Sequence, residues 1–128
     1  MLKKSLTAAL TAALVLTGSS AFAGSKSTAL SNGTLTISAD DGCLVSGNCS
    51  LYYSATTYKK TGGSKATIQL AMTTGAAAYK DSQKSISAGQ TQSKSWGGKK
   101  KSEVPDCSIA GFMVANTGTY YTPNLSVC

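Results

Sequence analysis

The 128-residue chain contains no histidine and no arginine, and it has only two prolines and one tryptophan. The absence of histidine excludes Ser-His-Asp and Cys-His catalysis, histidine-based zinc and copper sites, and the usual proton shuttle at neutral pH. Every basic residue is a lysine. Lysine makes diffuse electrostatic contacts, whereas arginine recognises a phosphate or a base through two parallel hydrogen bonds. This argues against sequence-specific nucleic-acid binding.

Acidic residues are also scarce. A glycosidase needs two carboxylates on either side of a cleft, and the chain offers only five, each in a turn-like context with no aromatic cleft sequence beside it: Asp40, Asp41, Asp81, Glu103 and Asp106. The cysteines lack the paired CxxC spacing of an all-cysteine metal site. We therefore expect no enzymatic activity, no cofactor and no metal.

Residues 1–23 have the features of a secretory signal peptide. Two lysines near the start precede an apolar run over residues 6–16, and an A-x-A sequence ends at Ala23. The run is too short to span a bilayer, and nothing later is apolar enough, so no transmembrane segment is expected after cleavage. We predict that residues 1–23 are removed and that residues 24–128 form a single secreted domain, extracellular or periplasmic.

Four cysteines follow the expected cleavage site, and an even number in an oxidising compartment indicates two disulfides. The sequence allows three pairings. Cys43 and Cys49 flank a short segment that ends near Gly47, and a tight hairpin turn there would bring them face to face. The favoured pairing therefore joins Cys43 to Cys49 and Cys107 to Cys128.

The second of these pairs depends on the register of the last hairpin. If the chain turns at Thr117-Gly118, counting outward brings the last two cysteines opposite one another. Pro123 would then fall where an N–H donor is needed, so we expect a bulge or an edge position there.

Short segments of alternating polar and apolar residues recur between turns, and none has the periodicity of an amphipathic helix. The expected strands begin at Gly33, after a nearly featureless stretch over residues 24–32. The most apolar run, residues 108–115, suits a strand buried on both sides. The pattern predicts an all-β fold, a small antiparallel β-sandwich or barrel of about seven or eight short strands stapled by two disulfides.

Residues 50–73 are expected to form the central hairpin, because Gly62-Gly63 can supply the positive φ angles of a two-residue turn. Pairing outward from this turn sets Lys60 opposite Lys65. The apolar residues of the second strand then face the core. The opposite face collects these side chains: Tyr52, Ser54, Thr56, Tyr58, Lys60 and Lys65.

Lysines gather at two expected loop tips, the turn of this hairpin and the Gly-Gly loop over residues 97–102. Such clusters suit docking on an anionic partner, with aromatic side chains adding contact area. The alternative is that exposed lysines only keep sheet edges unpaired. The predicted surface-binding residues are Lys59, Lys60, Lys65, Lys99, Lys100, Lys101, Tyr52, Tyr58 and Trp96.

These features together indicate a secreted, cationic, disulfide-stabilised, non-enzymatic binding protein. Its expected partner is an anionic cell-envelope polymer or lipid surface, as for an antimicrobial protein or toxin. Two alternatives remain open: a module that binds an acidic protein, as inhibitors and immunity proteins do, and a carbohydrate-binding module using Tyr52 and Tyr58. The sequence leaves the oligomeric state undetermined.

Overall fold

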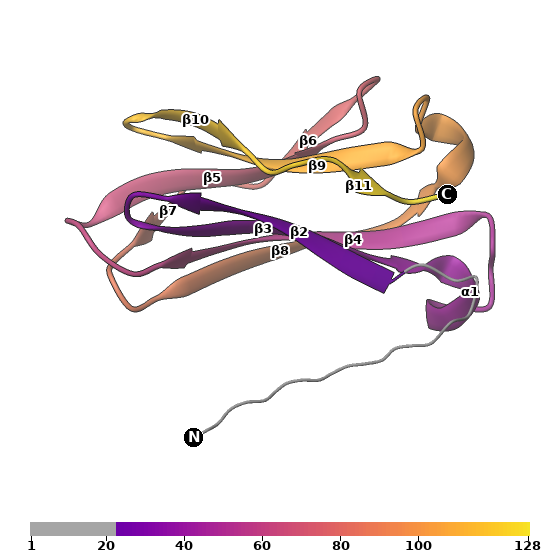
Figure 1. The fold of residues 1–128 in the computed structure, drawn as a ribbon, viewed down its shortest axis with the longest axis horizontal. Helices are drawn as coiled ribbons and strands as arrows, with labels where there is room; N and C mark the ends of the chain where they lie inside the picture. The colour runs from indigo at the N-terminus through magenta and orange to yellow at the C-terminus, as the bar shows by residue number, and fades with distance from the viewer. Residues whose placement is uncertain (1–22) are drawn as a thin grey trace.

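The computed structural model describes residues 23–128, and the predicted signal peptide lies outside the described residues apart from Ala23. Two antiparallel sheets pack face to face (Figure 1), which confirms the predicted all-β sandwich. Ten strands are present in this part of the chain, more than the seven or eight expected. The additional strands are short edge strands and the first strand, which the sequence did not reveal.

The first sheet has four strands in the order β2-β3-β4-β8. Its strands are β2 (Ala23–Leu30), β3 (Gly33–Asp41), β4 (Leu51–Lys60) and β8 (Thr91–Lys100). The expectation of a featureless start is wrong, because β2 pairs with β3 along its whole length. The polar composition of β2 hid it, since an edge strand with one exposed side needs few apolar residues.

The second sheet has six strands. Its central strand β9 pairs with β5 on one side and with β10 and β11 on the other. Its strands are β5 (Ala66–Thr73), β6 (Ala78–Lys80), β7 (Lys84–Ile86), β9 (Ser108–Ala115), β10 (Gly118–Tyr121) and β11 (Leu125–Ser126). Five consecutive residues of β9 are buried, so the prediction of a strand covered on both sides is confirmed.

The expected central hairpin is wrong, because β4 and β5 belong to different sheets. β4 pairs with β3 and β8, whereas β5 pairs with β6, β7 and β9. The connection between them bridges the sandwich and docks on the β2–β3 turn, where the N–H groups of Thr61 and Gly62 donate to the Asn32 carbonyl at 2.8 and 3.3 Å. Gly63 has a φ of 76°, and a Cβ there would lie 2.7 Å from the Asn32 side chain. Glycine is therefore required at this position, although the segment forms an arch between the two sheets and not the expected hairpin turn.

The face assigned to β4 is also wrong. Its inward residues are Tyr52, Ser54, Thr56, Tyr58 and Lys60, all of them buried. Both faces of β4 carry tyrosine and hydroxyl side chains, so its alternation contains too little hydrophobic contrast to show which face turns inward.

The core divides into two clusters along the length of the sandwich. Ile37, Tyr52 and Met72 belong to one cluster, and Leu35, Tyr58 and Ile68 belong to the other. Between the sheets, the indole N–H of Trp96 donates to the Thr56 hydroxyl at 3.0 Å, and this hydroxyl donates to the Ala71 carbonyl at 2.9 Å. These two polar side chains satisfy their hydrogen bonds within the core.

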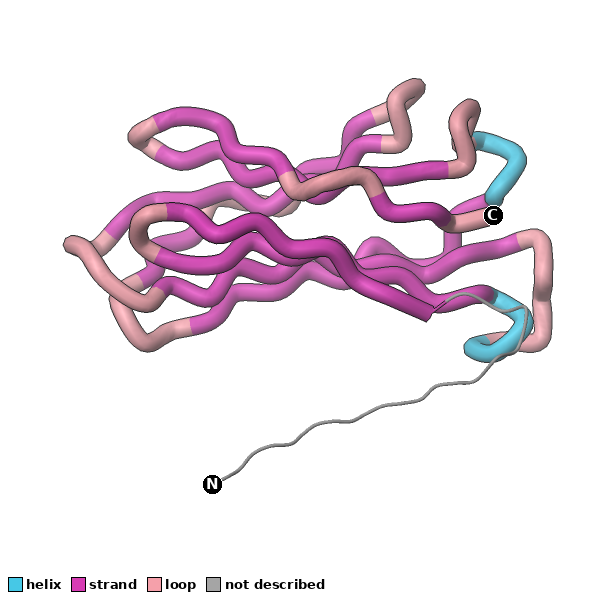
Figure 2. The backbone as a smooth tube through the Cα atoms, viewed as in Figure 1, coloured by secondary structure: helices cyan, strands magenta, loops and turns pink. Residues whose placement is uncertain are grey.

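Both disulfides lie at one end of the sandwich, which we call the disulfide end. It contains the short helices α1 (Gly42–Val45) and η2 (Lys101–Glu103) and the C-terminus, and Figure 2 shows the two helices in cyan at this end. The pairings Cys43–Cys49 and Cys107–Cys128 are confirmed. A turn of helix, however, takes the place of the expected hairpin between the first two cysteines.

The last hairpin is close to the expected one. The chain turns at Asn116-Thr117, since Ala115 pairs with Gly118. The register then slips by one residue between β10 and β11, where Leu125 pairs with Ile109. Pro123 lies in this gap outside the ladder, so the predicted irregularity at the proline is confirmed.

The opposite end of the sandwich has no covalent link among the described residues, and we call it the open end. Four connections meet there: the β2–β3 turn, the arch at residues 61–65, the β7–β8 turn and the β9–β10 turn. In Figure 1 it is the end farthest from α1 and from the C-terminus. The two ends are separated by the ten residues of β4, or roughly 30 Å at the usual rise per residue.

Candidate functional site

The nine predicted surface-binding residues do not share one surface. Lys59 and Lys60 close β4 at the open end, whereas Lys100 pairs with Leu51 at the start of β4, at the disulfide end. The two lysine groups are therefore separated by the length of the molecule.

Three of the nine are not on the surface at all. Tyr52, Tyr58 and Lys60 are 0%, 4% and 2% exposed, so the expectation that they provide contact area is wrong. The cause is the inverted face of β4. Burial raises the pKa of Tyr52 to about 12, with the Tyr79 and Glu103 charges adding to the effect. The carbohydrate hypothesis loses the two rings on which it rested, because a buried ring cannot stack on a sugar.

Two of the lysines at the disulfide end, Lys99 and Lys101, make local contacts. Lys99 and Lys100 belong to β8 and not to a loop. The Lys99 ammonium lies 4.1 Å from the centre of the Tyr79 ring, a cation–π contact. Lys101 forms an ion pair with Asp41, with the ammonium 3.0 Å from Oδ1.

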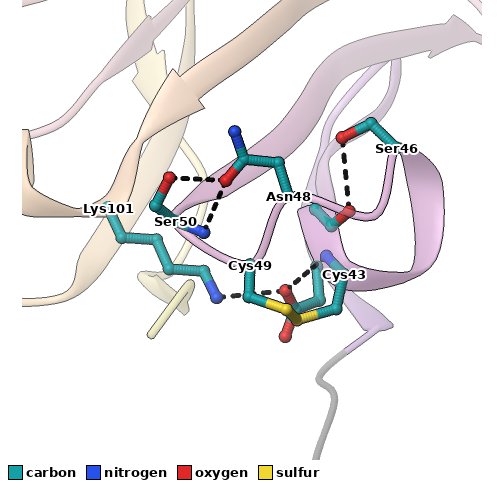
Figure 3. Close-up of a disulfide and its surroundings, with 8 residues drawn as sticks. Cys43, Ser46, Asn48, Cys49, Ser50 and Lys101 are labelled. Atoms are coloured by element: carbon teal, nitrogen blue, oxygen red, sulfur yellow. Dashed lines mark hydrogen bonds and ion pairs between the residues drawn. A yellow bond between two sulfur atoms is a disulfide. The ribbon is translucent and has the colours of Figure 1, made fainter.

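Asp41 joins several parts of the disulfide end (Figure 3). Its carboxylate accepts a hydrogen bond from the Cys43 N–H at 3.0 Å, which caps α1, and a second from Lys101 at 3.0 Å. These two bonds, the backbone one first, hold the pKa of Asp41 below its usual value. The Asp41–Lys101 pair therefore contributes to the structure of this end.

The open end contains a pocket of about 150 Å³ between the two sheets. Its apolar floor comes from Leu30, Ile68 and Met113, and Ala66 and Ala115 extend it. Its polar wall comes from the converging connections and from the strand ends beside them: Asn32, Tyr58, Lys60, Lys65, Asn116 and Tyr120. No described residue that lines the pocket is acidic.

Lys60 is the most unusual group in this pocket. Its backbone is fixed to the β7–β8 turn, because Lys60 N–H donates to the Gln90 carbonyl at 3.0 Å and Gly89 N–H donates to the Lys60 carbonyl at 2.8 Å. Its buried ammonium donates to the Gly62 carbonyl at 2.6 Å. No ion pair joins it to a carboxylate of the described chain. A buried ammonium without a counter-charge is costly.

The carboxylates of the chain are concentrated elsewhere. Asp40, Asp41, Glu103 and Asp106 lie at the disulfide end. Asp81 follows β6 and pairs with Lys84 at 2.7 Å and with Lys94 at 3.9 Å. The open end thus holds Lys59, Lys60 and Lys65 with no acidic residue beside them, and its positive charge is unbalanced.

Sequence reasoning identified two exposed members of this site, Lys59 and Lys65, but it missed the pocket. Asn32, Asn116 and Tyr120 come from connections far apart in the chain, and only the sandwich brings them together. Their positions beside turns gave no signal of a shared cavity. Lys60 was recognised as a lysine of interest, although its burial was not foreseen.

Across residues 23–128, no group of three or more histidine, cysteine, aspartate or glutamate side chains is placed to hold a metal ion. Over the same residues, no helix has the length and apolar character needed to cross a membrane. The two disulfides are consistent with a protein of an oxidising compartment. Comparison of the chain with models of protein families, with curated proteins and with solved structures gives no match.

Proposed function

We propose that this is a secreted, non-enzymatic binding protein that attaches to an anionic envelope surface through its open end. The observation that carries this proposal is the charge separation along the molecule. Three lysines stand at the open end without a carboxylate, whereas Lys84, Lys94 and Lys101 elsewhere form ion pairs with aspartates. A single charged end orients the molecule on a surface of opposite charge.

The exposed members, Lys59 and Lys65, are the residues that would contact the surface. Each lysine close to an anionic bilayer contributes about 1 kcal/mol, so the pair would strengthen binding by about 2 kcal/mol, or roughly 30-fold. The attraction is diffuse, because lysine acts as a point charge. Binding should weaken steeply with salt, since exposed charges are screened.

A vesicle experiment tests this proposal. The protein without residues 1–23 is mixed with neutral phosphatidylcholine vesicles or with vesicles containing phosphatidylglycerol, across a salt series, and co-sedimentation is measured. We expect salt-sensitive binding to the anionic vesicles alone and at least tenfold weaker binding of the Lys59→Glu/Lys65→Glu variant. The matched control, Lys80→Glu/Lys100→Glu, makes the same charge change at exposed residues outside the open end and should bind as the parent does.

Three outcomes would overturn the proposal: equal binding to neutral and anionic vesicles, insensitivity to salt, or equal loss in both variants. An acidic polysaccharide or wall polymer serves as a second arm. Binding to that polymer alone, with the same loss in the Lys59→Glu/Lys65→Glu variant, would keep the open end as the site and replace lipid with polymer as the partner. Capture of an acidic protein by the disulfide end would favour the protein-binding alternative.

A further inference from the structure

We propose that the open-end pocket binds a carboxylate attached to a short apolar group, with Lys60 as its counter-charge. This deepens the proposed function and shares its premise that the open end lacks negative charge. It adds a defined ligand class and a different set of residues. The exposed lysines attract anions to this end, and the pocket selects among them.

The first argument is the state of the Lys60 ammonium. An ammonium has three N–H donors, and one of them is used by the Gly62 carbonyl. The residue is buried, with an exposed fraction of 2%. Because the described part of the chain provides no carboxylate for it, a bound anion is the group that would complete its interactions.

The second argument is the shape and lining of the pocket. A volume of about 150 Å³ is enough for a ring of six carbon atoms, as apolar cavities of this size hold benzene. Ile68 and Met113 are both buried and form an apolar floor. The ring of Tyr58, also buried, lies beside them, and its pKa is raised by burial and then by Tyr120.

The third argument concerns ligand charge. Lys60 provides one buried positive charge, and Lys65 lies exposed on the wall. One buried charge matches a monoanion, because the second charge of a dianion would remain poorly compensated among apolar groups. A carboxylate with an apolar tail therefore fits better than inorganic phosphate. Both a free small organic acid and the apolar C-terminal residue of a peptide present this chemistry.

The pocket is also built to stay in place. The Lys60 backbone is held by two hydrogen bonds to the β7–β8 turn. On the opposite wall, the Tyr120 hydroxyl is hydrogen-bonded to the Thr117 hydroxyl at 2.8 Å, which holds the Tyr120 ring in place. Preorganised walls lower the entropy lost when a small ligand is ordered.

The experiment is a titration of ¹⁵N-labelled protein, followed by the amide signals of Gly62, Ala66 and Ala115. The probes are benzoate, its neutral counterpart benzyl alcohol, and inorganic phosphate. Acetyl-valine and acetyl-valinamide distinguish the peptide source from the free acid. We expect saturable shifts with benzoate, at least tenfold tighter than with benzyl alcohol or phosphate.

Two variants test the role of Lys60. Lys60→Met removes the charge and keeps the length of the side chain, and Lys60→Gln keeps a donor for the Gly62 carbonyl without the charge. Both should lose at least tenfold in benzoate affinity and should retain the thermal stability of the parent or exceed it, since a buried charge has been removed. Lys59→Met, the exposed neighbour, should bind benzoate as the parent does.

The inference is overturned if benzoate and benzyl alcohol bind equally, if no probe saturates, or if Lys60→Gln binds benzoate like the parent. If Lys60→Met does not fold, the benzoate affinity of Lys60→Gln alone tests the role of Lys60. The two proposals fail separately. Weaker vesicle binding by the single variant Lys59→Glu with benzoate binding intact supports both sites, because Lys59 does not line the pocket. Vesicle binding without any benzoate binding removes only the pocket ligand.

Discussion

The two ends of the sandwich differ in whether their buried charged side chains have a partner of opposite charge. At the disulfide end, Asp41 is bonded to Cys43 and Lys101, beside the Cys43–Cys49 disulfide. At the open end, no covalent link constrains the described chain, and Lys60 is buried with only a carbonyl for a partner. Charge that is paired within the protein contributes to stability, whereas charge left unpaired is available to a ligand.

The largest expected contrast between the ends comes from removing the disulfides. The Cys107–Cys128 bond spans 21 residues and the Cys43–Cys49 bond spans 6. By loop closure in the unfolded chain, the double variant Cys107→Ser/Cys128→Ser should lose about 3 kcal/mol of unfolding free energy, and Cys43→Ser/Cys49→Ser about 2 kcal/mol. Urea titrations of the three proteins measure both losses.

Under native conditions, both cysteine variants should still bind anions at the open end as the parent does. Loss of this binding while the variant remains folded would show that the two ends are coupled, and it would contradict the view that they act independently.

A smaller effect is expected at Tyr52, in the core near the disulfide end. Its buried hydroxyl has no hydrogen-bond partner among the described residues, so Tyr52→Phe should raise the free energy of unfolding by about 1 kcal/mol. Its pKa of about 12 exceeds the ordinary value of 10. The hydroxyl ionises in the unfolded chain at a lower pH than in the folded protein. The free energy of unfolding is therefore unaffected by this ionisation below pH 10 and falls as the pH rises from 10 to 12.

Tyr52→Phe should lack that part of the alkaline loss. Tyr58→Phe, at the open end, serves as the matched variant, and denaturation at pH 7 and pH 11 measures both. A destabilised Tyr52→Phe would contradict the account of the unpaired hydroxyl.

The smallest expected effect is acid sensitivity. The pKa of Asp41 is lowered by the Cys43 N–H and then by Lys101, so its stabilising contribution is present above about pH 4 and is lost as the pH falls through the folded value. Asp41→Asn keeps an oxygen acceptor for Cys43 without the charge. Its melting temperature should fall less between pH 6 and pH 3 than that of the parent.

The matched acid control is Asp81→Asn, because the pKa of Asp81 is also lowered, chiefly by Lys84, at a site outside the disulfide end. Amide exchange at pH 3 in the parent should increase around Cys43 and Lys101. Faster exchange at the open end instead would contradict the assignment, because that end has no carboxylate to protonate.

Several features of the fold were predictable because they depend on neighbours in sequence. Disulfide pairing followed from cysteines on either side of turns, and the irregularity at Pro123 followed from its missing N–H. The burial of β9 followed from an apolar run. In each instance, one local physical constraint was sufficient.

The arrangement of β4 was not predictable, for two reasons. Gly62-Gly63 signals a sharp reversal, but a reversal can join neighbours in one sheet or cross between two. The strand itself alternates tyrosine and hydroxyl residues on both faces, so Tyr52 and Tyr58 gave no sign that they were inside. The pocket depends on this choice, because the inward face of β4 provides Lys60.

The crossing from β4 to β5 also determines how the protein can fold. The β2–β3–β4 meander joins consecutive segments and can form soon after collapse. The pairing of β5 with β9, which brings Ile68 beside Ala115, instead joins segments that are far apart in the sequence. Contacts so distant in sequence slow folding, and the open-end pocket, which needs both sheets in place, would be among the last features to form.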